Sequence, residues 1–79
     1  MHSGLVTLKS GKSVGKHSTK ECEEMIIVLN GSGELSFDHA KTLGMEDGFI
    51  LYCPPCTEHD VINTGKKLLK YIYVAAKIN

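Results

Sequence analysis

The alternation of apolar and polar residues along this chain predicts strands. Leu35 and Phe37, and then Leu51 and Cys53, occupy every second position, as in strands that bury one face. Gly and Asn interrupt the apolar segments before any of them reaches the length of an ordinary helix. The predicted strands are Leu5–Lys9, Ser13–His17, Met25–Leu29, Gly33–Asp38, Phe49–Cys53, His59–Asn63 and Leu68–Ala75.

Many short strands joined by close turns indicate an all-β sandwich or barrel. The chain has 79 residues, which gives one domain, 1–79, near the lower size limit for a self-supporting core. We assign Phe37, Phe49 and the whole run 25–29 to that core. Because so short a chain buries little apolar surface, we also expect a homodimer.

Charge and composition exclude several classes of function. Nine basic residues balance nine acidic ones, so no positive field draws in phosphate backbones and we expect no nucleic-acid partner. No apolar run is long enough to cross a membrane, and Met1–Gly4 lacks the pattern of a secretory signal. Cys22, Cys53 and Cys56 form an odd set typical of reduced thiols. These features favour a cytoplasmic location for the protein.

Two gapped patterns carry the functional argument. The first reads Gly11, five residues, His17-Ser18-Thr19, four residues, Glu24, six residues, Gly31. The second reads Gly48, five residues, Pro54-Pro55-Cys56, two residues, His59, three residues, Asn63. They resemble the two cupin motifs and span about two thirds of the chain. The resemblance implies a small cupin-type jelly-roll β-barrel.

The cupin resemblance also implies a metal site in the barrel. His17, Glu24 and His59 match three of the family's four ligands, whereas Thr19 stands where the second histidine is expected. Two imidazoles and a carboxylate leave coordination positions open for water, oxygen or substrate. The candidate metals are Zn, Fe, Mn and Ni. A hydroxyl is a poor ligand beside imidazole, so we assign Thr19 a contact to a water or ligand and leave metal occupancy open.

Several residues have simpler interpretations. His39 follows Asp38 in a predicted turn, and His2 lies at a terminus without a converging partner, so both are left out of the site. Tyr52, Tyr71 and Tyr73 are assigned to cross-strand packing. Cys56 replaces the glycine usual in the family, which predicts an altered turn.

Three functions remain open. The leading hypothesis is a small barrel that binds a divalent metal, a small organic molecule, or both. A metal-dependent cupin enzyme of the dioxygenase or sugar isomerase type is the first alternative, although no separate acid or base clearly faces the interior. The second alternative is a zinc module that uses Cys53, Cys56 and His59, with Cys22 as a fourth ligand.

Overall fold

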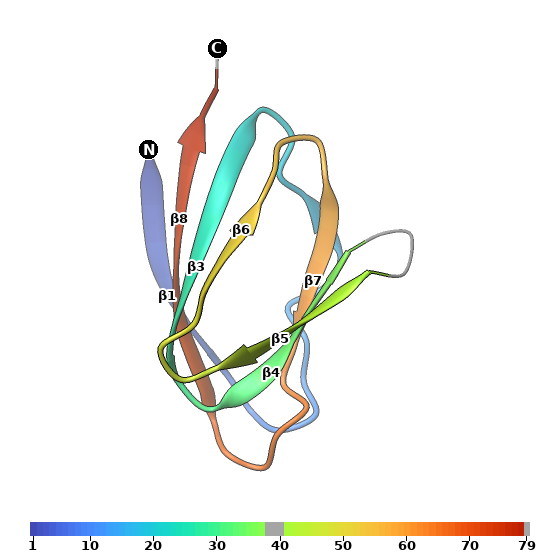
Figure 1. Cartoon of the computed structure of the whole chain (residues 1–79), viewed down its shortest axis with the longest axis vertical. Coiled ribbons are helices and arrows are strands. Elements are labelled where there is room, and N and C mark those ends of the chain that lie inside the picture. Colours follow the sequence, from blue (N-terminus) through green and yellow to red (C-terminus); the bar gives the residue numbers. More distant parts are fainter. Residues whose placement is uncertain (38–40, 79) are drawn as a thin grey trace.

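The computed structural model describes residues 1–37 and 41–78, and this part of the chain consists of strands and turns (Figure 1). No helix long and apolar enough to cross a membrane occurs in these residues. The strands are β1 (His2–Leu8), β2 (His17–Ser18), β3 (Cys22–Asn30), β4 (Ser32–Phe37), β5 (Thr42–Glu46), β6 (Ile50–Cys53), β7 (Glu58–Ile62) and β8 (Leu69–Lys77).

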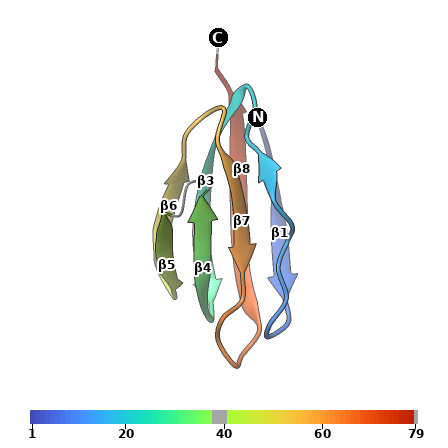
Figure 2. The ribbon, with the colours of Figure 1, turned by 90° about the vertical axis from the view of Figure 1, so that its right-hand side faces the viewer.

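Two four-stranded antiparallel sheets face each other. Their strand orders are β1-β8-β3-β6 and β2-β7-β4-β5, and Figure 2 shows the two layers. Neighbours in each sheet are far apart in sequence, apart from β4 and β5, so the chain crosses repeatedly from one layer to the other. This is the order of an eight-stranded jelly roll. The predicted all-β fold class is confirmed.

Strand alternation places the core between the two sheets. The buried cluster takes residues from both layers: Ile26, Val28, Leu51, Cys53, Leu69 and Tyr71 from one, and Leu35, Met45 and Val61 from the other. Phe37 packs against this cluster, as predicted. Within the run 25–29, Ile26 and Val28 are buried as predicted, but the assignment of Phe49, Met25 and Leu29 to the core was wrong, because each of them is more than 40% exposed.

The sequence analysis missed one strand and misplaced another. β5 was missed because Thr42–Glu46 has only two apolar residues, Leu43 and Met45, with Gly44 between them. The expected strand Ser13–His17 is instead a single bridge from Ser13 to Ile62, followed by the short β2. Gly15 has a φ of 103°, which ends the extended conformation before His17. The predicted end of one strand at Asp38 lies outside the described residues, as does His39.

Gly31 turns the chain from one sheet into the other. It joins β3 to β4 with a φ of 90°, and a Cβ added there would lie 2.4 Å from the carbonyl oxygen of Leu68. Both the positive φ and the close backbone approach require glycine. The turn is therefore an inter-sheet corner, and it brings the end of β3 close to the start of β8.

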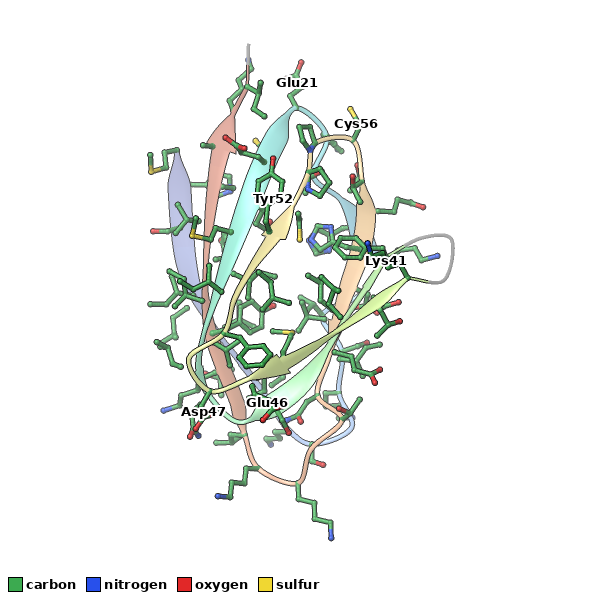
Figure 3. All side chains as sticks on the ribbon, in the orientation of Figure 1. Glu21, Lys41, Glu46, Asp47, Tyr52 and Cys56 are labelled. Atoms are coloured by element: carbon green, nitrogen blue, oxygen red, sulfur yellow. The ribbon has the colours of Figure 1, made fainter. Side chains whose placement is uncertain are left out.

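The turn between β6 and β7 holds Cys56, which stands where glycine was expected, in a conformation that glycine favours. Cys56 has a φ of 54°, and its amide donates a 2.8 Å hydrogen bond to the carbonyl of Lys20, which itself has a φ of 55°. Figure 3 places Cys56 at the same end of the molecule as Glu21. A non-glycine side chain in the left-handed region costs about 1–2 kcal/mol. The turn is therefore strained at Cys56.

Relief of this strain is testable. We expect Cys56→Gly to raise the free energy of unfolding by about 1 kcal/mol, because glycine adopts a positive φ without steric penalty. In a domain of this size the melting temperature should rise by roughly 4–8 °C. Cys56→Ala is the matched control, since it removes the thiol and keeps the strain. Equal melting temperatures for the two variants would contradict this interpretation.

Candidate metal centre

Three potential ligands converge between the sheets. His17 on β2 lies directly opposite His59 on β7, and their ring centroids are 4.3 Å apart. Glu24 reaches the pair from β3, which belongs to the facing sheet. One ligand atom from each of the three side chains lies within 4.8 Å of the others. The structure thus brings together all three ligands predicted from the sequence.

Backbone carbonyls orient both imidazoles. Nδ1 of His17 lies 2.9 Å from the carbonyl oxygen of Gly15, and Nδ1 of His59 lies 3.2 Å from that of Thr57. A carbonyl oxygen only accepts, so each Nδ1 carries the proton and donates it. In a neutral ring this leaves the Nε2 lone pair available. Such hydrogen bonds fix the tautomer and the ring orientation in metal sites.

The chemistry of this group fits a divalent cation. Nε2 of His59 is buried without a hydrogen-bond partner, and its nearest charged neighbour is Oε2 of Glu24 at 3.5 Å. Buried polar atoms are normally paired, and the Glu24 carboxylate is the partner of this nitrogen when the ring is protonated; when the ring is neutral, the Nε2 lone pair and the carboxylate together can face a cation. Ligands about 2.0–2.2 Å from one ion lie roughly 3–4 Å apart, so small side-chain movements would close this set around a metal.

Glu24 also changes the acidity of His59. The contact with the Glu24 carboxylate raises the pKa of His59 above its ordinary value, although burial acts in the opposite direction. The hydrogen bond to the carbonyl of Thr57 and the charge of Asp60 raise the pKa further. Without metal, the His59–Glu24 pair therefore favours a protonated imidazole.

Thr19, at the position of the fourth family ligand, braces the loop between β6 and β7. Its hydroxyl donates a 2.7 Å hydrogen bond to the carbonyl of Pro54 and accepts one of 3.1 Å from the amide of Thr57. The side chain is buried and lines the cavity beside the three ligands. The hydroxyl hydrogen of Thr19 is thus already used in a hydrogen bond. The predicted contact to a water or ligand relies on the remaining lone pair of the Thr19 oxygen.

The three ligands line a cavity of about 360 Å³ with walls that are largely apolar. Tyr71 and Tyr73 of β8 also line it, so these tyrosines face the site in addition to packing in the sheet. Burial raises the pKa of Tyr71, which keeps its phenol neutral. His2 is a residue that sequence reasoning missed. It lies on β1, lines the same cavity and contacts Tyr73 edge-on, with ring centroids 5.9 Å apart.

The period-two pattern could have identified His2. Val6 and Leu8 of β1 pack against the core, and residues two apart on a strand face the same side. Extending that pattern back through Gly4 places His2 on the inner face. His2 does not belong to the group that could hold a metal, but it begins β1, which pairs with β8 over its whole length and so holds the residue beside the cavity.

The cysteines do not join the ligand group. Cys53 is fully buried in the core, and burial raises the pKa of its thiol to about 12. Cys56 is exposed, and Cys22 is half-buried. Within residues 1–37 and 41–78, the group that could hold a metal comprises two histidines and a glutamate and includes none of these thiols. This argues against the cysteine zinc module.

Comparison with known proteins identifies the family. The model of the cupin domain matches residues 4–75, nearly the whole chain. The chain belongs to the cupin family. The resemblance inferred from the two motifs is therefore confirmed. No curated protein matches the sequence.

Solved cupin structures share this fold. A predicted oxalate decarboxylase from Thermotoga maritima is 24% identical, with a TM-score of 0.89 over 96% of this chain and 65% of that one. A Cupin 2 conserved barrel domain protein from Salinispora arenicola is 26% identical, with a TM-score of 0.82 over 92% and 60%. The cupin domain of Schizosaccharomyces pombe Cnp3 is 20% identical, with a TM-score of 0.88 over 96% and 52%. This cupin chain thus spans between half and two thirds of each structure.

The His59–Glu24 pair predicts a pH dependence of the metal-free cupin. Because the pKa of His59 is raised in the folded state, its contribution to stability is present below about pH 6.5, the unfolded value, and is lost as pH rises through the folded pKa. Urea unfolding of chelator-treated protein should show this loss. Glu24→Gln should remove it, and an unchanged pH profile in that variant would contradict the assignment.

The three thiols should differ in reactivity. Iodoacetamide should alkylate Cys56 first and Cys22 more slowly, whereas Cys53 should react only after unfolding, because its thiol is buried and protonated. Mass spectrometry of timed samples checks this order. Protection of Cys56 that disappears on chelation would instead support the cysteine zinc module.

Proposed function

We propose that this cupin binds a divalent transition-metal ion through His17, Glu24 and His59. The observation that carries the proposal is the buried Nε2 of His59, which has no hydrogen-bond partner and lies beside the Glu24 carboxylate. The backbone hydrogen bonds at both Nδ1 atoms support it, because they aim the two Nε2 atoms before any ion arrives.

The ligand types limit the choice of metal. Two imidazoles and one carboxylate suit Zn, Fe, Mn or Ni and leave coordination positions open. When bound, such an ion supplies a Lewis acid or a centre for oxygen binding. This chain's residues contribute the rest: the carbonyls of Gly15 and Thr57 hold the rings, and Thr19 holds the loop that leads into β7.

We further propose that a small organic molecule with an oxygen donor occupies the cavity beside the metal. A volume of about 360 Å³ lies at the small end of the range for ligand pockets. Apolar walls formed by residues such as Val6, Val61 and Ala75 suit a compact carbon skeleton. The three free thiols suit the reducing cytoplasm, which is where we place the protein.

A metal-dependent enzyme is a second candidate, favoured by His2. The imidazole of His2 lies at the cavity and could exchange protons with a bound molecule, which supplies the separate acid or base that the sequence seemed to lack. The similar Thermotoga structure is named a predicted oxalate decarboxylase, and its title supports enzymatic chemistry for that protein only. Metal-dependent turnover in a panel of small organic acids and sugars would separate this candidate from a binding protein.

The test of the metal proposal is calorimetric titration of chelator-treated protein with Zn, Fe(II), Mn or Ni. We expect one ion per chain for at least one metal. His59→Ala and Glu24→Gln should each weaken its affinity by at least about 100-fold, because each removes a direct ligand. Cys56→Ser is the control and should bind as the wild type does. Failure of all four metals to bind the wild type would contradict the proposal.

A further inference from the structure

The segment that leads to His17 contains one more residue than the strand beside it. Ser13 pairs with Ile62, and His17 pairs with His59. Three residues lie between Ser13 and His17, whereas two lie between His59 and Ile62. An extra residue in one of two paired segments is a β-bulge, and it lies here at the β2 edge of its sheet. Bulges at such edges change the direction in which a side chain points.

This bulge decides which side chain enters the metal centre. His59 faces inward, so Ile62, three residues further along β7, faces outward, as does Ser13 opposite it. In an uninterrupted strand His17 would face the same way as Ser13, four residues before it. The uninterrupted register would also set Lys16 opposite His59. The extra residue therefore turns His17 inward and places an imidazole, in place of an ammonium group, beside His59.

Gly15 lies within the bulge, and side chains bind both of its backbone polar groups. Its φ is 103°, a conformation that glycine adopts without steric penalty. Its amide donates a 2.9 Å hydrogen bond to Oδ1 of Asp60. Its carbonyl accepts the 2.9 Å hydrogen bond from Nδ1 of His17. The first contact holds the bulge against β7, and the second orients the ring of His17.

We propose that Asp60 is a positioning residue for His17. The Asp60 carboxylate holds the amide of Gly15, and the carbonyl of Gly15 holds the imidazole, so Asp60 acts on this ligand through a single residue. Partners of this kind behind a metal ligand typically contribute about 10- to 100-fold to metal affinity. The effect on metal affinity rests on the proposed function, whereas the effect on the geometry of His17 does not.

The two histidines differ in how much they depend on such a contact. His17 is exposed and belongs to a strand of two residues at the edge of its sheet. His59 is buried, lies within the longer strand β7, and is oriented by the carbonyl of Thr57. Loss of the Asp60 contact should therefore release His17 and leave His59 in place. The charge of Asp60 also raises the pKa of His59, so the test must separate charge from hydrogen bonding.

Two substitutions at Asp60 make this separation. Asp60→Ala removes the charge and the hydrogen bond, whereas Asp60→Asn removes the charge and keeps an oxygen that can accept from the Gly15 amide. In calorimetric titration with a metal that the wild type binds, Asp60→Ala should weaken affinity by about 10- to 100-fold, and Asp60→Asn should stay within about 3-fold of the wild type. Equal losses in both variants, or no loss in either, would overturn the proposal.

Glu58→Ala is the matched control for the titration. Glu58 is exposed, lies two residues before Asp60 and projects from the same outward face of β7. Its removal deletes a nearby carboxylate without touching the contact to Gly15, so metal affinity should stay close to that of the wild type. Circular dichroism should show that all three variants fold. A loss in Glu58→Ala as large as that in Asp60→Ala would overturn the proposal.

Nuclear magnetic resonance of the metal-free protein tests the geometry of His17 directly. At alkaline pH, where imidazole rings are neutral, the ring nitrogen shifts should place the His17 proton on Nδ1 in the wild type and in Asp60→Asn. Asp60→Ala should lose this preference, while His59 should keep its proton on Nδ1. An unchanged His17, or an equal change in both rings, would overturn the proposal. If the wild type binds no metal but His17 responds as expected, the proposed function fails and the role of Asp60 stands.

Discussion

Strand β3 lies between β8 and β6, and the alternation of its side chains divides the molecule into an inside and an outside. Glu24, Ile26 and Val28 face the second sheet, whereas Met25, Ile27 and Leu29 face away from it. Because the period of a strand is two, a shift of one residue would move the carboxylate out of the site and the core residues into water. The register of β3 against β8 and β6 therefore fixes both the core and the candidate metal centre.

Positioning of His59 depends on a loop that is held from several sides. Thr19 bonds to Pro54 and Thr57, and Cys56 bonds to the carbonyl of Lys20 across the same end of the molecule. These contacts join the segment after β2 to the segment before β7. β2 is only two residues long and forms few backbone hydrogen bonds with β7. The loop contacts therefore help to keep His17 opposite His59. The strain at Cys56 is tolerated because this network leaves its backbone no other conformation.

Sequence patterns predicted the all-β class and the three candidate ligands because both depend on local spacing and motif residues. Met25, Leu29 and Phe49 could not be placed correctly, since an apolar residue is compatible with either face of a strand until its register is known. β5 was missed because its glycine and its two polar end residues leave only two apolar residues, too few to indicate a strand. The strand forms because it pairs with β4. The convergence of His17 and Glu24 also needed the structure, because they come from different sheets and no periodicity relates them.

Binding of a metal ion would add to the stability of a domain with a small core. A domain below about 80 residues has a core worth only a few kcal/mol, and here a buried histidine and a half-buried glutamate side chain occupy part of the interior. An ion that binds only the folded chain, at concentrations above its dissociation constant, adds stability in proportion to the logarithm of its concentration.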